Sequence, residues 1–157
     1  MNILVLSDSH GRKDFMMHVL EKEKFCDLVF FLGDGLTDAQ KCAEMYPEKK
    51  FMMVRGNNDT DRNVDTEAYK YIDGITIMAC HGHIPDVRYT LTNLFESAKS
   101  VRANLVLYGH THIQDMYNSA TYGICAVNPG ALCSGKYCVI EIKNGQYDIK
   151  FKGVFAG

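Results

Sequence analysis

Short apolar runs that end in metal-ligand residue types dominate this sequence and restrict the folds open to it. Five such runs occur, and each is followed closely by aspartate, asparagine or histidine. The ligand-type residues after the runs are, in chain order, Asp8 and His10, then Asp34, Asn57 and His81, and finally His110 and His112. In open α/β sheets, binding sites form where the carboxyl ends of strands converge. The pattern therefore predicts a sheet with a polar site at one edge.

The first half of the chain alternates strand and helix patterns. Strand-like apolar runs cover residues 3–7, 27–32 and 50–54, and helical spacing of apolar residues covers 14–24 and 37–45. Strand–helix–strand units of this length require right-handed crossovers and give a parallel sheet.

The second half carries hairpin signals at Asp73-Gly74 and Asn144-Gly145. The elements expected there are strands at 69–72, 75–80, 104–108, 124–128, 137–143 and 146–151, and a helix at 87–101. Parallel units followed by antiparallel hairpins predict an α/β fold in which two mixed β-sheets pack as a sandwich flanked by helices. No repeat or linker divides the sequence, so we expect one domain over residues 1–157.

Composition excludes several classes of protein. The chain is 46% apolar and 23% charged, as in ordinary globular proteins. A net charge of −2 without a run of like charges argues against a dedicated nucleic-acid surface. The longest apolar run, residues 28–32, is far shorter than the ~20 residues that span a membrane. The six cysteines form no CxxC pair, and the opening residues lack a secretory signal pattern, so we expect a reduced, cytoplasmic protein.

The donor types indicate which ions such a site would bind. Residues i and i+2 of an extended segment point to the same side, so Asp8 with His10, and His110 with His112, can each aim two side chains into one cavity. Mixed oxygen and imidazole donors suit Mn²⁺, Fe²⁺, Zn²⁺, Co²⁺ or Ni²⁺ better than Mg²⁺ or Ca²⁺ alone. Seven donors are too many for one ordinary ion and suit two ions that share a carboxylate.

The ordered motifs resemble those of the calcineurin-like metallophosphoesterases, and most closely the small YfcE-like phosphodiesterases. They are Asp8-x-His10, Gly33-Asp34, Gly56-Asn57-x-Asp59, His81-Gly82 and Gly109-His110-x-His112, and Asn128-Pro129-Gly130 also resembles a segment of the small branch. The resemblance implies a four-layer fold and two divalent metal ions, with manganese favoured and iron, nickel, zinc or cobalt as alternatives. It also implies that a metal-bridging hydroxide attacks a phosphodiester of a small substrate.

The resemblance further implies individual roles. Asp8, His10 and His112 would hold one metal, Asn57, His81 and His110 the other, and Asp34 would bridge both. Asp34, Asn57, Asp59 and His81 are the residues expected to serve catalysis, with Asp59 acting on groups near Asn57 rather than on a metal.

One position departs from the pattern of many relatives. Asn58 stands where they carry a histidine that is thought to assist the leaving group, and asparagine cannot act as a general acid. Esters with good leaving groups would then be hydrolysed more readily than alkoxides, unless a metal-bound water or His83 substitutes. The residues expected to contact substrate are Arg12, Arg55, Asn58 and His83.

Plainer interpretations exist for these residues. Asp8 would be a good N-cap for the following helix, and Asp34, Asn57 and Asn58 are common turn residues. His110 and His112 could be structural histidines beside a turn. At the level of function, the alternatives are a phosphomonoesterase or nucleotide phosphatase with the same site, and a non-catalytic protein-binding scaffold of the same fold. The sequence leaves a homodimer open.

Overall fold

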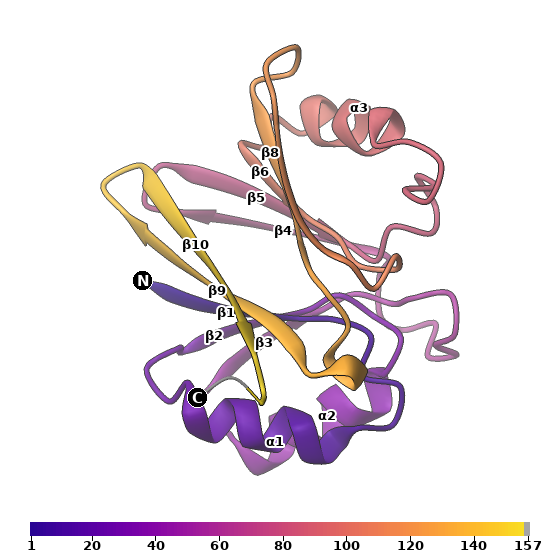
Figure 1. Cartoon of the computed structure of the whole chain (residues 1–157), viewed down its shortest axis with the longest axis vertical. Coiled ribbons are helices and arrows are strands. Elements are labelled where there is room, and N and C mark those ends of the chain that lie inside the picture. The colour runs from indigo at the N-terminus through magenta and orange to yellow at the C-terminus, as the bar shows by residue number, and fades with distance from the viewer. Residues whose placement is uncertain (156–157) are drawn as a thin grey trace.

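Two five-stranded sheets form the centre of the computed structural model, which describes residues 1–155 (Figure 1). The first sheet has the order β10-β9-β1-β2-β3 and consists of β1 (Asn2–Leu6), β2 (Leu28–Phe31), β3 (Lys50–Met53), β9 (Lys136–Lys143) and β10 (Gln146–Gly153). The second has the order β4-β5-β6-β8-β7 and consists of β4 (Glu67–Ile72), β5 (Ile75–Cys80), β6 (Leu105–Leu107), β7 (Gln114–Ser119) and β8 (Ile124–Pro129).

Both sheets are mixed. In the first, β1, β2 and β3 run parallel, and β9 and β10 add antiparallel strands beside β1. In the second, β5, β6 and β8 run parallel, and β4 and β7 form antiparallel edges. The prediction of two mixed sheets in an α/β fold is therefore confirmed.

Helices cover the outer faces of the sheets (Figure 1). The first sheet packs on α1 (Lys13–Lys22) and α2 (Leu36–Met45), and the second on α3 (Thr92–Ser100). A short 3-10 helix, η1 (Leu132–Ser134), joins β8 to β9. The order of the layers is helices, sheet, sheet, helix.

Alternation along the strands explains why these layers pack. In β1, Ile3 and Val5 contribute to the core between the sheets, whereas Leu4 and Leu6 contribute to the core beneath α1 and α2. Successive strand side chains point to opposite faces, and β1 is buried on both. Full burial of such a side chain contributes about 1.5–3 kcal/mol, which explains the continuous apolar runs in the sequence.

The two hairpin signals are confirmed. Asp73 and Gly74 have φ angles of 44° and 90°, and Asn144 and Gly145 have φ angles of 54° and 73°. Two successive positive φ angles define the tight turn whose twist matches that of paired strands.

The observed elements differ from the sequence predictions at one helix and one strand. The helix predicted at 87–101 begins only at Thr92, because Val87 N–H bonds to the Gly82 carbonyl and the Thr90 hydroxyl accepts a hydrogen bond from Thr92 N–H. The strand β7 was not predicted. It is an edge strand with four of its six residues exposed, so no alternation of apolar residues marks it in the sequence.

The cysteines are all free, and five of the six are buried. Burial raises the pKa of Cys26 to about 11 and that of Cys80 to about 12. None of the helices within residues 1–155 is long and apolar enough to cross a membrane.

We expect one thiol to react rapidly with Ellman's reagent in the native protein, because only Cys133 is partly exposed and thiolates are the reactive form. Counting released thionitrobenzoate over time measures this. Cys133→Ser should remove the rapid phase, whereas Cys138→Ser, at a buried position, should leave it. A rapid phase that survives Cys133→Ser would contradict the burial of the other five.

Candidate metal centre

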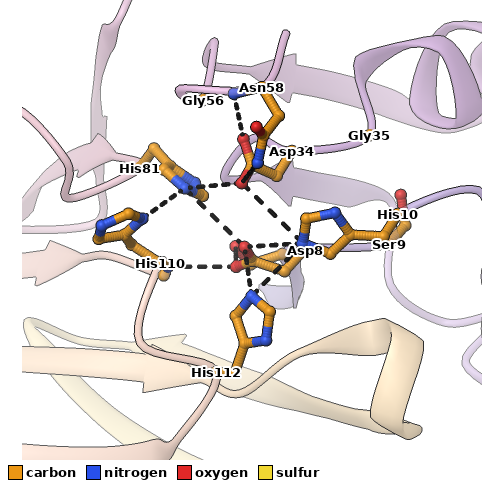
Figure 2. A network of polar contacts seen from close by, with 12 residues as sticks. Asp8, Ser9, His10, Asp34, Gly35, Gly56, Asn58, His81, His110 and His112 are labelled. Atoms are coloured by element: carbon orange, nitrogen blue, oxygen red, sulfur yellow. Dashed lines mark hydrogen bonds and ion pairs between the residues drawn. The ribbon is translucent and has the colours of Figure 1, made fainter.

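Two aspartates and four histidines from both sheets converge at the strand ends (Figure 2). Asp8 and His10 follow β1, Asp34 follows β2, His81 follows β5, and His110 and His112 follow β6. The loops are joined to one another by their backbones: Asp8 N–H donates to the Gly33 carbonyl, and Gly109 N–H donates to the His81 carbonyl. Because these parallel strands end at one edge of the sandwich, residues far apart in sequence meet there.

One group of ligand atoms gathers around the Asp8 carboxylate. Its Oδ1 lies 3.1 Å from His112 Nε2 and 3.6 Å from His10 Nε2. The two imidazole nitrogens lie 3.4 Å apart. All three ligand atoms fall within 4.8 Å of one another, which is close enough to share one ion.

A second group contains Asp8, Asp34 and His81, all buried. His81 Nε2 lies 3.3 Å from Asp34 Oδ2 and 3.8 Å from Asp8 Oδ1. Asp34 Oδ2 is also 3.9 Å from His10 Nε2, so both carboxylates lie between the two groups.

The hydrogen bond on the far side of the His81 ring tests whether this cluster fits a metal. His81 Nδ1 donates to the Leu32 carbonyl at 2.7 Å, which turns Nε2 toward the two carboxylates. A neutral ring with this tautomer presents a lone pair to acceptors, so the arrangement needs a positive charge there, either a proton or a cation. Carbonyl-anchored histidines facing carboxylates are typical of metal sites. The residues present therefore fit a divalent cation.

The charges shift the pKa values of these groups. Burial acts to raise the pKa of Asp34, but hydrogen bonds from His81 and Asn58 outweigh it, and the pKa is lowered. Burial acts to lower the pKa of His81, but Asp34 and Asp8 outweigh it, and the pKa of that histidine is raised. The Asp34 carboxylate therefore stays ionised, and it attracts a cation to the centre.

His110 stands at the margin of the cluster. Its Nδ1 lies 3.2 Å from His81 Nε2, and its backbone N–H donates to Asp8 Oδ2 at 3.1 Å. Burial lowers the pKa of His110, and the charges of His81 and Arg88 lower it further. A neutral imidazole is the form that binds metals.

Glycines allow the β2 and β3 loops to touch behind Asp34. A Cβ at Gly33 would lie 2.6 Å from Gly56 N, and a Cβ at Gly56 would lie 2.2 Å from Asp34 Oδ1. Gly33 also has a φ angle of 100°, which other residues rarely adopt. A side chain at Gly56 would displace the Asp34 carboxylate, and one at Gly33 would push the backbone of the β3 loop away.

Five of the candidate ligands have left-handed backbone conformations. The φ angles are 55° for Asp8, 43° for His10, 61° for Asp34, 72° for His110 and 65° for His112. The expectation that these loops are extended was therefore wrong, although Asp8 and His10 do point to the same place. Tight turns rather than extended strands aim the side chains.

Asp59 supports the centre without facing it. Its Oδ2 accepts hydrogen bonds from the backbone N–H groups of Asp34 and Gly56, both at 2.8 Å. Its Oδ1 accepts from Gly35 and Leu36 N–H, both at 3.0 Å. Asp59 thereby caps α2 and fixes the loop that carries Asp34.

The sequence did not reveal two further supports. Asp38 Oδ2 accepts from the Ser9 hydroxyl at 2.6 Å and from Gly11 N–H at 2.9 Å, which fixes the loop around His10. Asn128 donates to the Gly109 carbonyl and the Thr111 hydroxyl, which fixes the loop that carries His110 and His112. The Asn128-Pro129-Gly130 motif could have indicated a role for Asn128. Asp38 has no such motif, because an aspartate in the first turn of a helix is common.

The structure does not bring every predicted residue into the cluster. Asn57 is exposed and makes no hydrogen bond or ion pair within residues 1–155. Its neighbour Asn58 instead donates to Asp34, through backbone N–H at 2.9 Å and side-chain Nδ2 at 2.8 Å. Arg12 pairs with Asp14 and lies over the Phe15 ring. Arg55 lies in the loop after β3, beside the cluster.

This chain has the features of a layered α/β metal-binding protein, in which carboxylates and histidines gather where the strand ends converge. A family model for the calcineurin-like phosphoesterase superfamily domain matches residues 1–145. The chain belongs to this superfamily.

Two similar proteins are both described as probable metallophosphoesterases. One, from Mycoplasma pneumoniae, is 32% identical over 92% of this chain and 91% of its own length. The other, YsnB from Bacillus subtilis, is 25% identical over 96% of this chain and 90% of its own length.

Solved structures share the fold. A conserved protein of Streptococcus pneumoniae, named as a predicted phosphoesterase, superposes with a TM-score of 0.82 at 24% identity, covering 98% of this chain and 89% of that one. An archaeal phosphodiesterase gives 0.71 at 20% identity, covering 97% and 100%. Vps29 of Entamoeba histolytica, in complex with Zn²⁺, gives 0.74 at 16% identity, covering 98% and 99%.

Proposed function

We propose that this protein is a phosphodiesterase that hydrolyses small phosphate esters with two divalent metal ions. The observation that carries the proposal is the convergence of the buried carboxylates Asp8 and Asp34 with histidines from both sheets. Membership of the phosphoesterase superfamily supports the reaction class. The archaeal phosphodiesterase with the same fold is consistent with diesters as substrates.

We assign the ligands as follows. Asp8, His10 and His112 would hold one ion, and His81, His110 and Asn57 the other, with Asp34 shared. The position of Asp34 Oδ2, 3.3 Å from His81 Nε2 and 3.9 Å from His10 Nε2, supports the shared role. Binding by Asn57 requires its exposed side chain to turn toward His81. Oxygen and imidazole donors favour manganese, with iron, nickel, zinc or cobalt as alternatives.

Two divalent ions held by these residues would supply a more acidic water molecule and positive charge to offset that of the phosphoryl oxygens. The chain's own residues would position and orient the groups that hold the ions. Asn58 donates two hydrogen bonds to Asp34 and keeps its carboxylate facing the histidines. The Leu32 carbonyl fixes the His81 ring, so that Nε2 is the atom presented to an ion.

Protonation of the leaving group limits the range of substrates. Asn58 has no proton to give as an acid, and its side chain is already bound to Asp34. The His83 ring lies 5.5 Å from the His81 ring between centroids, and burial lowers the pKa of His83. Esters with good leaving groups, such as p-nitrophenolate, should therefore react fastest.

The test is restoration of activity by metal. Protein dialysed against a chelator should hydrolyse bis(p-nitrophenyl) phosphate only after Mn²⁺ or another transition ion is added, with an increase of at least about a hundredfold. Absorbance of released p-nitrophenolate measures this. No hydrolysis of any phosphate ester with any of the five ions would reject the proposal. Comparing bis(p-nitrophenyl) phosphate with p-nitrophenyl phosphate distinguishes a phosphodiesterase from a phosphomonoesterase.

The environment is part of the same proposal. We propose that the protein works in the cytoplasm, since all six cysteines are free thiols, as a reducing compartment keeps them. Its partner would be a small phosphate ester rather than a nucleic acid, in keeping with a net charge of −2.

A further inference from the structure

A cavity of about 340 Å³ borders the candidate metal centre on the side of the β3 loop. Its lining includes Arg55, Asn57, Thr60, Arg62 and His83. Two contacts show that it shares walls with the centre. The His83 ring lies 5.5 Å from the His81 ring, and Asn57 is flanked by Gly56 and Asn58, which contact Asp34. A molecule bound at the centre can therefore extend into this cavity.

The cavity contains arginine side chains that have no hydrogen-bond or ion-pair partner among the described residues. Arg55 is half-buried and Arg62 exposed, and neither guanidinium forms a hydrogen bond or an ion pair with any residue in the range 1–155. His83 Nδ1 is buried and, among the same residues, lacks a hydrogen-bond partner. Unpaired donors in a hollow next to a reaction centre are available to a ligand.

The nearby carboxylates form no hydrogen bond with these arginines. Asp59 also lines the cavity, but its two oxygens already accept four backbone N–H groups. Asp61 interacts electrostatically with Arg55, but its carboxylate accepts its hydrogen bonds from the Gln40 side chain and the Asn63 backbone N–H. The two guanidinium groups therefore keep their N–H donors free for an anionic ligand.

We propose that this cavity binds a second phosphate group of the substrate, so that the enzyme prefers esters that carry two phosphate groups. Arginine guanidinium groups match phosphate oxygens in a bidentate fork, and the Thr60 hydroxyl adds a further donor at the wall. This inference rests on the proposed function, because one phosphate group must occupy the metal centre while the other occupies the cavity.

Flexible bisphosphates test the proposal, because the distance between their two phosphate groups can adjust to the distance between the metal centre and the cavity. Propane-1,3-diyl and hexane-1,6-diyl bisphosphate are compared with propyl and hexyl phosphate as inhibitors of bis(p-nitrophenyl) phosphate hydrolysis at saturating Mn²⁺. In the wild type, at least one bisphosphate should bind about tenfold more tightly than the monophosphate of the same length, as expected for one charge-assisted contact. In Arg55→Ala/Arg62→Ala, the ratio should fall to the factor of about two that two identical groups give statistically.

The ratio within each variant cancels any general loss of activity or folded fraction. Arg88→Ala is the matched control, because Arg88 acts electrostatically on His110 but does not line the cavity, and it should keep the wild-type ratio. Arg55→Lys keeps the charge but loses the fork, and should give an intermediate ratio.

Three results would overturn the cavity assignment: a wild-type ratio near two for both lengths, an unchanged ratio in the double variant, or an equal loss in Arg88→Ala. Failure of the wild type to hydrolyse any phosphate ester with any of the five ions is a separate result, which rejects the proposed function and this inference with it.

Discussion

Replacing Asp34 with asparagine is expected to reduce hydrolysis of bis(p-nitrophenyl) phosphate about a thousandfold, equivalent to about 4 kcal/mol of transition-state stabilisation. Asp34 Oδ2 lies between His10 and His81, so the substitution removes the negative charge that both ions would share. It also turns a carboxylate that accepts from Asn58 into an amide whose NH₂ would face those donors. Steady-state kinetics and metal analysis of the same sample measure the two effects together.

A matched control separates this effect from a general loss of an aspartate. Asp148→Asn removes an exposed carboxylate from the edge strand β10 and should leave activity and metal content within about twofold of the wild type, as is usual for surface substitutions. Full activity in Asp34→Asn would contradict the shared-carboxylate role. A non-catalytic scaffold of this fold would show no hydrolysis in the wild type either, and Asp34→Asn would leave its partner binding intact.

Replacing Asp59 with alanine is expected to destabilise the folded protein by about 3 kcal/mol, because buried N–H groups without partners cost about 1–3 kcal/mol each and solvent can reach some of the four. The same substitution should lower activity about a hundredfold, since the loop carrying Asp34 loses its anchor, a loss of about 3 kcal/mol. Urea denaturation of the metal-free protein measures the first effect, and hydrolysis under native conditions measures the second.

Asp65→Ala is the control for this loop, since Asp65 is exposed and only its backbone carbonyl forms a contact, with Arg55 N–H. It should unfold like the wild type. If Asp59→Ala kept wild-type stability but lost one metal equivalent, Asp59 would be a ligand rather than a positioning residue.

The sequence predicted that these side chains converge at the strand ends, because the relevant pattern is local. A strand followed at once by a ligand-type residue is visible in one short window, as at Cys80-His81 or Ser7-Asp8. Parallel pairing of β1 with β2 and of β5 with β6 then brings the strand ends together. The hairpin at Asp73-Gly74 was equally local, because two residues determine the turn.

Contacts between distant segments could not be predicted in this way. Asp59 reaches Gly35 across 24 positions, and Asp38 reaches Ser9 across 29, so no window contains both partners. The choice between Asn57 and Asn58 as the neighbour of Asp34 depends on the path of one turn, which residue types alone do not define. The edge strand β7 was missed because most of its residues face solvent, and burial is what produces a readable pattern.

The left-handed backbone at five of the candidate ligands sets stability and ligand binding in opposition. Each such conformation costs an L-residue about 1 kcal/mol, so the five together cost on the order of 5 kcal/mol, which is comparable with the whole stability of a small domain. Glycine would relieve that cost at every one of these positions, yet none of the five is glycine. The five candidate ligands therefore hold their side chains in place at a cost in backbone strain, which the entropy that glycine loses on folding would only partly offset.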